Sequence, residues 1–168
     1  MASPRKTFAL VGSALAGGAL LSFTPFTPTA TASTVCNGGN LTVTTSPIGE
    51  MDMPVNGNLS GTLTGCDVQG FQGTFTGTGS CNDVQVNVDA DLIWANGDKT
   101  HVTGPFHVPG GPTPPGTSNT LQATSGPDAG SNIIVNTGPI DNPPSLVGPC
   151  LSASARSITI PFQSVIIG

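Results

Sequence analysis

The sequence has no tyrosine, a single tryptophan and very few charged side chains. Charged residues make up only 8% of the chain, so the Lys, Arg and Glu side chains that favour exposed helices are nearly missing. The chain instead holds 23 Gly and 16 Pro, which weaken helices. This composition argues against a helical fold. Disorder would also suit so much Gly and Pro, but the alternating apolar pattern described below argues against it for most of the chain.

Half of the scarce basic residues lie at the extreme N-terminus. Arg5 and Lys6 precede an apolar and small-residue run, and a small-x-small cleavage motif ends at Ala32. We therefore predict that residues 1–32 are a signal peptide removed on export. A membrane anchor is the weaker alternative, because Gly and Ser dilute the run and its core is shorter than the ~20 residues of a spanning helix.

The remaining chain, residues 33–168, is strongly acidic. Lys99 and Arg156 are its two basic residues against nine acidic ones, which gives a net charge of −7. We do not expect such a chain to bind nucleic acid, or a membrane once the leader is cleaved. Its size fits one domain with a modest core. We predict a single secreted all-β domain.

The clearest structural pattern lies in residues 84–108. From Val84 to Trp94 the even positions are apolar and the odd positions mostly polar, which predicts a half-buried strand. The run then breaks at Ala95-Asn96-Gly97. We predict a three-residue hairpin loop with Gly97 in the left-handed conformation, because a two-residue turn would mix the two faces of the returning strand.

This loop length fixes the register of the returning strand. It pairs Val86 with Phe106 and Asp91 with His101, and it puts Trp94 and Phe106 on one apolar face. We expect Trp94, Gly97 and Phe106 to be the main structural residues of this hairpin.

Other alternating segments predict further short strands. Each is bounded by Gly, Pro, Asn or Ser, and residues 46–56 are predicted to be a loop. The segments are residues 40–45, 58–66, 71–80, 119–125, 131–136 and 156–167. In the last one, Ile158, Ile160, Phe162 and Ile166 are expected on one side. About eight short strands predict an antiparallel sandwich or a small barrel.

Glycine alternates with Leu or Phe along one face of residues 58–80. Inward glycines remove core volume, so we expect the gaps to receive large side chains such as Trp94 or Phe106, or to permit the curvature of a barrel wall. Compositional drift in a Gly- and Thr-rich exported protein is the alternative.

Four cysteines, Cys36, Cys66, Cys81 and Cys150, allow three pairings in an exported chain. Cys66 and Cys81 fall at opposite ends of one hairpin, roughly 30 Å apart, and so cannot pair. Cys36 and Cys66 fall at the same end if their strands are antiparallel. We predict the disulfides Cys36–Cys66 and Cys81–Cys150. Metal binding is disfavoured because no Cys-x-x-Cys spacing occurs.

Several of these features together resemble a family of small, uncharacterised secreted proteins of actinobacteria. The shared features are Cys36-Asn37-Gly38 after the leader, Ser46-Pro47 before a Gly/Thr strand ending at Cys66, Cys81, the Trp94-x-x-Gly97 hairpin, and Cys150 before an Ile-rich strand. The Pro-rich segment after Val108 departs from the pattern. The resemblance implies an exported all-β domain and no particular activity.

One surface cluster carries candidate chemistry. Asp89 and Asp91 alternate along the outer face of their strand, and the predicted register brings His101 opposite Asp91. Calcium binding and a glycosidase carboxylate pair are possible functions. We favour a solvated face that protects a sheet edge, because side chains on a flat strand diverge whereas Ca²⁺ needs converging oxygens.

No catalytic motif supports an enzyme. The chain lacks Gly-x-Ser-x-Gly and His-Glu-x-x-His, and His101 and His107 are too far apart to share a metal. A hydrolase with a dispersed active site stays open, and no cofactor is expected. We favour a non-catalytic extracellular structural or interaction protein. Binding of cell-wall glycan or another secreted protein, through Pro/Gly-rich end loops near Gly110 and Asn142, is the alternative, although exposed aromatic side chains are scarce.

Overall fold

The computed structural model describes residues 33–110, 115–139, 150–152 and 154–168. This part of the chain forms nine strands, all joined in antiparallel pairs. They are β1 (Thr34–Cys36), β2 (Gly39–Ile48), β3 (Met53–Leu63), β4 (Val68–Gly79), β5 (Asp83–Trp94), β6 (Lys99–Pro109), β7 (Ser118–Ser125), β8 (Asn132–Thr137) and β9 (Ala155–Ile167). The predicted signal peptide and Asn142 lie outside the described residues.

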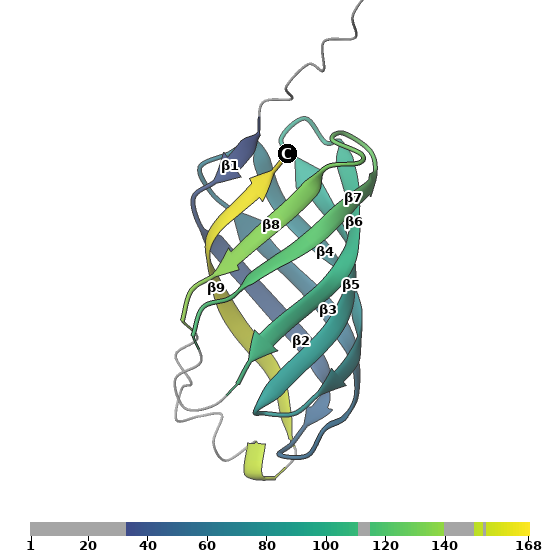
Figure 1. The fold of residues 1–168 in the computed structure, drawn as a ribbon, viewed down its shortest axis with the longest axis vertical. Helices are drawn as coiled ribbons and strands as arrows, with labels where there is room; N and C mark the ends of the chain where they lie inside the picture. The colour runs from purple at the N-terminus through teal and green to yellow at the C-terminus, as the bar shows by residue number, and fades with distance from the viewer. Residues whose placement is uncertain (1–32, 111–114, 140–149, 153) are drawn as a thin grey trace, which may run out of the picture. The chain divides into compact units, whose positions relative to one another are not determined.

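The sheet closes on itself into a barrel (Figure 1). Strands β2 to β8 follow one another in chain order, and β9 pairs with β2 on one side and with β8 on the other. The short β1 continues the line of β2 along β9. The predicted all-β, antiparallel fold is therefore confirmed, and of the two predicted architectures the barrel is the one observed. Closure leaves β2 to β8 with partners on both sides.

The long hairpin has the predicted register. Val86 pairs with Phe106 and Asp91 with His101, and Gly97 has φ 90°. The Gly97 N–H donates to the Trp94 carbonyl at 2.9 Å, and the Trp94 N–H donates to the Asp98 carbonyl at 2.9 Å, so the loop has three residues. Phe106 is buried and Trp94 packs against the same core.

Two sequence-based predictions about strands are wrong. The loop expected at 46–56 is confined to residues 49–52, because β3 already starts at Met53 and buries Val55. In β9, Ile166 does not share the inward side of Ile160, since a register shift near Gln163 turns Val165 and Ile167 inward instead. A β-bulge of this kind inverts the alternation beyond it.

Two inward glycines of β3 receive large side chains, as expected, but not the expected ones, whereas Gly73 and Gly77 of β4 lie opposite Ala90 and Val86. A Cβ at Gly57 would lie 2.8 Å from Cζ of Phe75, and one at Gly61 would overlap the ring of Phe71. The rings of β4 thus lie across the glycines of β3. The prediction that Trp94 or Phe106 would fill these gaps is wrong, because the paired register puts Phe71 opposite Gly61 and Phe75 opposite Gly57.

Both predicted disulfides are present. Cys36 and Cys66 have their Cα atoms 4.8 Å apart, and Cys81 and Cys150 have theirs 6.0 Å apart. The first joins β1 to the turn after β3, and the second joins the β4–β5 turn to the residues before β9. Within the described ranges, no helix has the length and apolar character to cross a membrane.

Candidate functional site

The barrel is closed by packed side chains at the end that carries the Cys36–Cys66 disulfide. Cys36, Val68 and Thr100 are fully buried there. The Trp94 indole N–H donates to Thr100 Oγ1 at 2.9 Å, and the Thr100 hydroxyl donates to the Pro127 carbonyl at 2.6 Å. This chain of hydrogen bonds ties the β5–β6 hairpin to the turn between β7 and β8.

Below this packed end the barrel encloses a cavity of about 170 Å³. Inward side chains of β2 to β9 form its wall, and nearly all of them are aliphatic or aromatic. At depth the cavity is lined by Leu63, Phe71, Leu92, Ile133, Phe162 and Val165. Every buried side-chain nitrogen or oxygen in the described part of the chain has a hydrogen-bond partner, so none of them is an unsatisfied polar group inside the barrel.

The cavity reaches the surface at the opposite end, which we call the mouth. There the inward side chains are only partly buried, and the ladders pair Val43 with Ile158 and Val84 with Val108. Ser80, Ser157 and the Cys81–Cys150 disulfide also line the cavity at this end. The mouth is therefore an apolar rim with a few hydroxyl groups.

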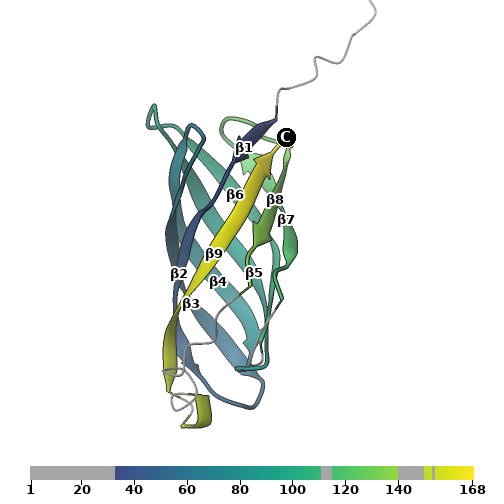
Figure 2. The same ribbon diagram turned by 90° about the vertical axis from the view of Figure 1, so that its left-hand side faces the viewer.

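Among the described residues, the strands leave the wall beside the mouth incomplete. Strands β7 and β8 are short and lie in the half of the barrel nearer the C-terminus, as the two views show (Figures 1 and 2). Backbone pairing of β6 to β7 is limited to residues 101–103 of β6. Nearer the mouth, the Asn119 side chain joins β7 to β6 in place of backbone pairing. Its Oδ1 accepts from the His107 N–H at 2.7 Å, and its Nδ2 donates to the His107 carbonyl at 3.1 Å.

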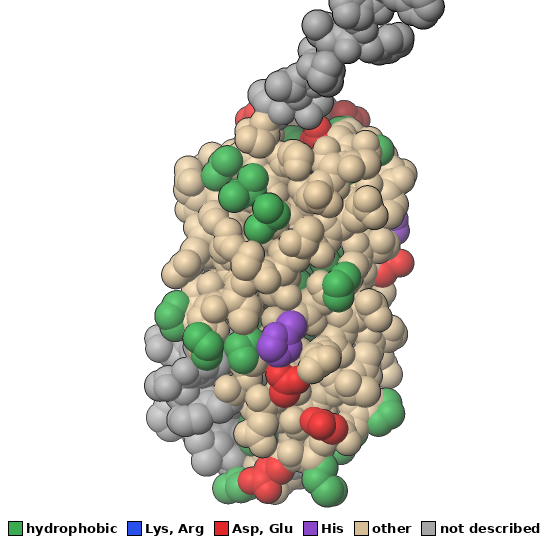
Figure 3. Space-filling view, in the orientation of Figure 1, with side chains coloured by type: hydrophobic (Ala, Val, Ile, Leu, Met, Phe, Trp, Pro, Cys, Tyr) green, Lys and Arg blue, Asp and Glu red, His purple; other side chains and the backbone are tan. Residues whose placement is uncertain are grey.

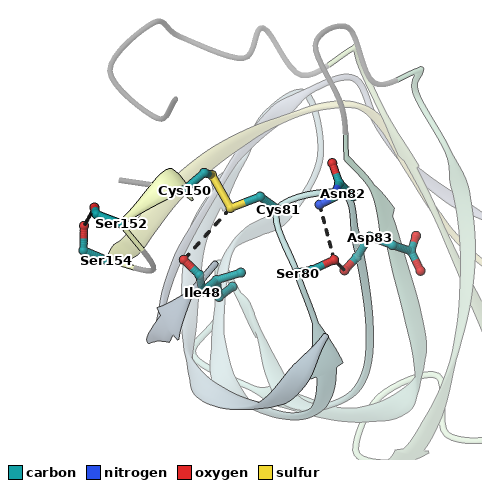
Figure 4. The surroundings of a disulfide bond; sticks show 8 residues. All are labelled: Ile48, Ser80, Cys81, Asn82, Asp83, Cys150, Ser152 and Ser154. Atoms are coloured by element: carbon teal, nitrogen blue, oxygen red, sulfur yellow. Dashed lines mark hydrogen bonds between the residues drawn. A yellow bond between two sulfur atoms is a disulfide. The ribbon is translucent and has the colours of Figure 1, made fainter. Parts of the chain in front are cut away.

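The β4–β5 turn holds the rim together (Figure 4). The Cys81 N–H donates to the Gly49 carbonyl at 2.8 Å, at the end of β2, and the Gly110 N–H donates to the Asn82 carbonyl at 2.9 Å, at the end of β6. The disulfide adds Cys150, and the Cys81 sulfur contacts the Ile48 carbonyl at 4.0 Å. The mouth therefore has a fixed outline on the β2, β5 and β6 sides.

The predicted surface cluster forms on the outer face of the barrel. His101 Nδ1 lies 3.0 Å from Asp91 Oδ1, and His101 Nε2 lies 3.6 Å from Asp89 Oδ1. Lys99 Nζ lies 3.6 Å from Asp91 Oδ2. The hydrogen bond from His101, helped by the charge of Lys99, holds the pKa of Asp91 below its usual value.

This cluster borders a shallow polar hollow across five strands. The ladders align its side chains in rows, for example Ser60, Gln72 and Asp91. Its polar lining side chains are Thr42, Thr44, Asn58, Ser60, Gln72, Thr74, Asp89, Asp91 and His101. The opposite face, drawn in Figure 3, is likewise mostly uncharged, with no Lys or Arg in view.

The interpretation of Asp89 and Asp91 as protection for a sheet edge is wrong. β5 is paired along its length with β4 and with β6, so it is not an edge strand. Among the described residues, no group of three or more His, Cys, Asp or Glu side chains is arranged to hold a metal ion. The His101 ring occupies the space between the two carboxylates and binds both.

The sequence reasoning missed the cavity. Its lining is the inward face of nearly every strand, so each residue appears in the sequence as an ordinary core position. The one local signal was the small inward residue Ala90, together with the glycines Gly73 and Gly77 opposite Ala90 and Val86. Because these residues are small, β4 and β5 contribute less side-chain volume to the interior of the barrel.

Comparisons with models of protein families, with curated proteins and with solved structures found no match to this chain.

Proposed function

We propose that this protein is a non-catalytic extracellular binding protein that takes a small apolar molecule into its barrel. The observation that carries the proposal is the apolar cavity of about 170 Å³ that opens at the mouth. Barrels of about eight strands are just wide enough either to fill with side chains or to hold one small ligand. Here the side chains do not fill the interior.

The size of the void favours a ligand over imperfect packing. An empty apolar cavity costs about 24 cal/mol per Å³, so this one would cost roughly 4 kcal/mol. That is a large share of the free energy of unfolding of a folded domain, which is typically about 5–15 kcal/mol. An apolar molecule in the cavity would recover part of this loss through dispersion contacts and exclusion of water.

A location outside the cell is part of the proposal. Two disulfides suit an oxidising compartment. The leader-like residues 1–32 and the resemblance to secreted actinobacterial proteins support the same location. An acidic chain poor in Lys would stay soluble there as a carrier or receptor for a small molecule.

Thermal unfolding in the presence of small hydrocarbons tests the proposal. The purified protein is heated with hexane or benzene at increasing concentrations and followed by circular dichroism. A ligand that binds only the folded state raises Tm in proportion to the logarithm of its concentration, by several degrees at 100 times its Kd. A Tm that neither hydrocarbon changes contradicts the proposal.

A second candidate function is supported by the outer hollow beside His101. Its aligned hydroxyl, amide and carboxylate groups would suit the hydroxyl groups of a cell-wall glycan, or a polar surface of another secreted protein. A glycan array compares the parent with an Asp89→Asn, Asp91→Asn double variant. Saturable binding that the double variant loses supports this function, and equal signals from both proteins reject it.

A dispersed hydrolase site gains no support from the geometry. In the described structure, both ring nitrogens of His101 face aspartates. The His107 ring contacts Asp83 through Nε2, and no described serine hydroxyl is hydrogen-bonded to that ring. A hydrolytic base instead needs a free ring nitrogen directed at its nucleophile.

A further inference from the structure

The length and volume of the cavity restrict the shape of its ligand. Cavity-lining residues of β5 run from Val84 to Leu92, a distance of about 26 Å along the strand and roughly 20 Å along the barrel axis at the usual tilt. A volume of about 170 Å³ spread over that depth would be thinner than a hydrocarbon chain, so the void occupies only part of the lined interior. The rings of Phe71, Phe75 and Phe106 line this interior, so a wide ring system would have to displace them.

The polarity of the wall changes along the cavity. The deep part offers only hydrocarbon surface, and polar side chains occur at the mouth, where Thr45, Ser80 and Ser157 line the cavity. A polar ligand group placed in the deep part would lose its hydrogen bonds to water without replacement. Such a ligand would bind more weakly than one whose polar group stays in water. The polar end of a ligand must therefore remain at the mouth.

The charge around the mouth is mainly negative. Glu50 and Asp52 lie in the turn between β2 and β3, and Asp83 begins β5. Hydrogen bonds from Gln85 and His107 lower the pKa of Asp83, so it is ionised at neutral pH. Arg156 in β9 is the single Lys or Arg in the described strands at this end. A ligand with a carboxylate end would be repelled here, whereas a hydroxyl or carbonyl would not.

We infer that the cavity takes an unbranched aliphatic molecule with one uncharged polar end, which stays at the mouth; a medium-chain alcohol is the simplest member of this class. This inference rests on the proposed binding function and adds the ligand class. A cavity of 150 Å³ in another protein holds benzene, so about six to eight carbon atoms fit inside the barrel. Longer chains would extend through the mouth.

A panel of four compounds of defined shape tests the inference by calorimetry and by Tm. The compounds are hexane, octan-1-ol, octanoate and 1-adamantanol. We expect octan-1-ol to bind with a Kd at least tenfold lower than that of octanoate at pH 7, and 1-adamantanol to leave Tm unchanged. Binding of 1-adamantanol as tight as that of octan-1-ol overturns the ligand class but leaves the binding function intact. Failure of hexane and octan-1-ol together overturns the binding function itself.

A matched pair of variants on β5 locates the binding. Ala90 faces the cavity and Asn87 faces solvent. Ala90→Leu fills the middle of the cavity and should weaken octan-1-ol binding at least tenfold, whereas Asn87→Leu should leave it unchanged. If Ala90→Leu fails to fold, Val88→Ile adds a single methyl group to the same wall and should weaken binding several-fold. Unchanged binding in the folded cavity variants overturns the inference.

Discussion

At the scale of single residues, the His101 ring determines the ionisation of Asp91. Its hydrogen bond is the main cause of the lowered Asp91 pKa, ahead of the charge of Lys99. We therefore predict that His101→Ala, which removes the donor, raises the pKa of Asp91 toward its ordinary value of 3.8. NMR titration of the side-chain carboxyl carbons measures this change.

Asp83 provides the internal control for that titration. The pKa of Asp83 is also lowered, but by Gln85 and His107, so it should not change in His101→Ala. Because the folded-state pKa of Asp91 is lowered, its contribution to stability is present above pH 4 and is lost as the pH falls through the folded-state value. For a pair this exposed that contribution is only a few tenths of a kcal/mol. An unchanged Asp91 pKa in the variant contradicts the role given to His101.

Gly61 shows how closely neighbouring strands pack inside the barrel. A Cβ there would overlap the Phe71 ring and the Asn40 carbonyl of the adjacent strand. We predict that Gly61→Ala lowers the free energy of unfolding by about 1–3 kcal/mol, because the ring must leave its position. Urea denaturation measures the difference.

Gly138, which is buried, is the control. A Cβ at Gly138 would make only ordinary contacts, the nearest being 3.5 Å from Cγ of Pro161. Gly138→Ala should therefore be neutral or slightly stabilising. Equal losses in both variants would mean that the Phe71 contact is not the cause.

At the scale of elements, the closed end of the barrel depends on Thr100, which joins two hairpins. Thr100 is fully buried and bonds to both the Trp94 indole and the Pro127 carbonyl. We predict that Thr100→Val, which keeps the shape and removes the hydroxyl, costs about 1–3 kcal/mol because it removes two hydrogen bonds, to the half-buried Trp94 indole and to the Pro127 carbonyl. Denaturation followed by Trp94 fluorescence measures it.

Thr103→Val on the same strand is the control. Thr103 is partly exposed and faces outward, so its substitution should change stability by less than about 0.5 kcal/mol. If the Thr100→Val protein is as stable as this control, the Thr100 hydrogen bonds do not stabilise the closed end of the barrel.

Single strands were predictable from the sequence because side-chain alternation is a local signal. The register of the β5–β6 hairpin followed from Gly97 and from the need to keep the apolar side chains on one face, and the disulfide pairs followed from strand length and antiparallel strand direction. The start of β3 at Met53 was not predicted, because Pro54 and the glycines interrupt the apolar pattern of this strand. Pro161 cannot donate to a ladder and therefore predicts an edge or a bulge in this segment. The position of the bulge at Gln163 was not predictable, since it depends on how β9 meets β8. The proximity of His101 to Asp91 was predictable. That this pair borders a polar hollow across five strands was not.

At the scale of the whole barrel, closure and the cavity were beyond local reasoning. Closure depends on β8 pairing with β9, and a sandwich would use the same strands with the same alternation. The cavity is the space left after all inward side chains are placed, so its volume depends on the barrel radius as much as on residue size. The strands alone therefore predicted a core but not a binding site.

The Cys81–Cys150 disulfide should act on stability mainly through the unfolded chain. It joins residues 69 apart in sequence, and the entropy of closing such a loop corresponds to about 4 kcal/mol. We predict a loss of this size in the Cys81→Ala, Cys150→Ala double variant, measured by guanidinium denaturation. Because the bond lies at the mouth and Trp94 lies at the closed end, the fluorescence of the folded variant should equal that of the parent. A shifted Trp94 emission would show that the bond maintains the shape of the folded barrel, and a loss below about 1 kcal/mol would show that the mouth is held by the Cys81 and Asn82 backbone bonds instead.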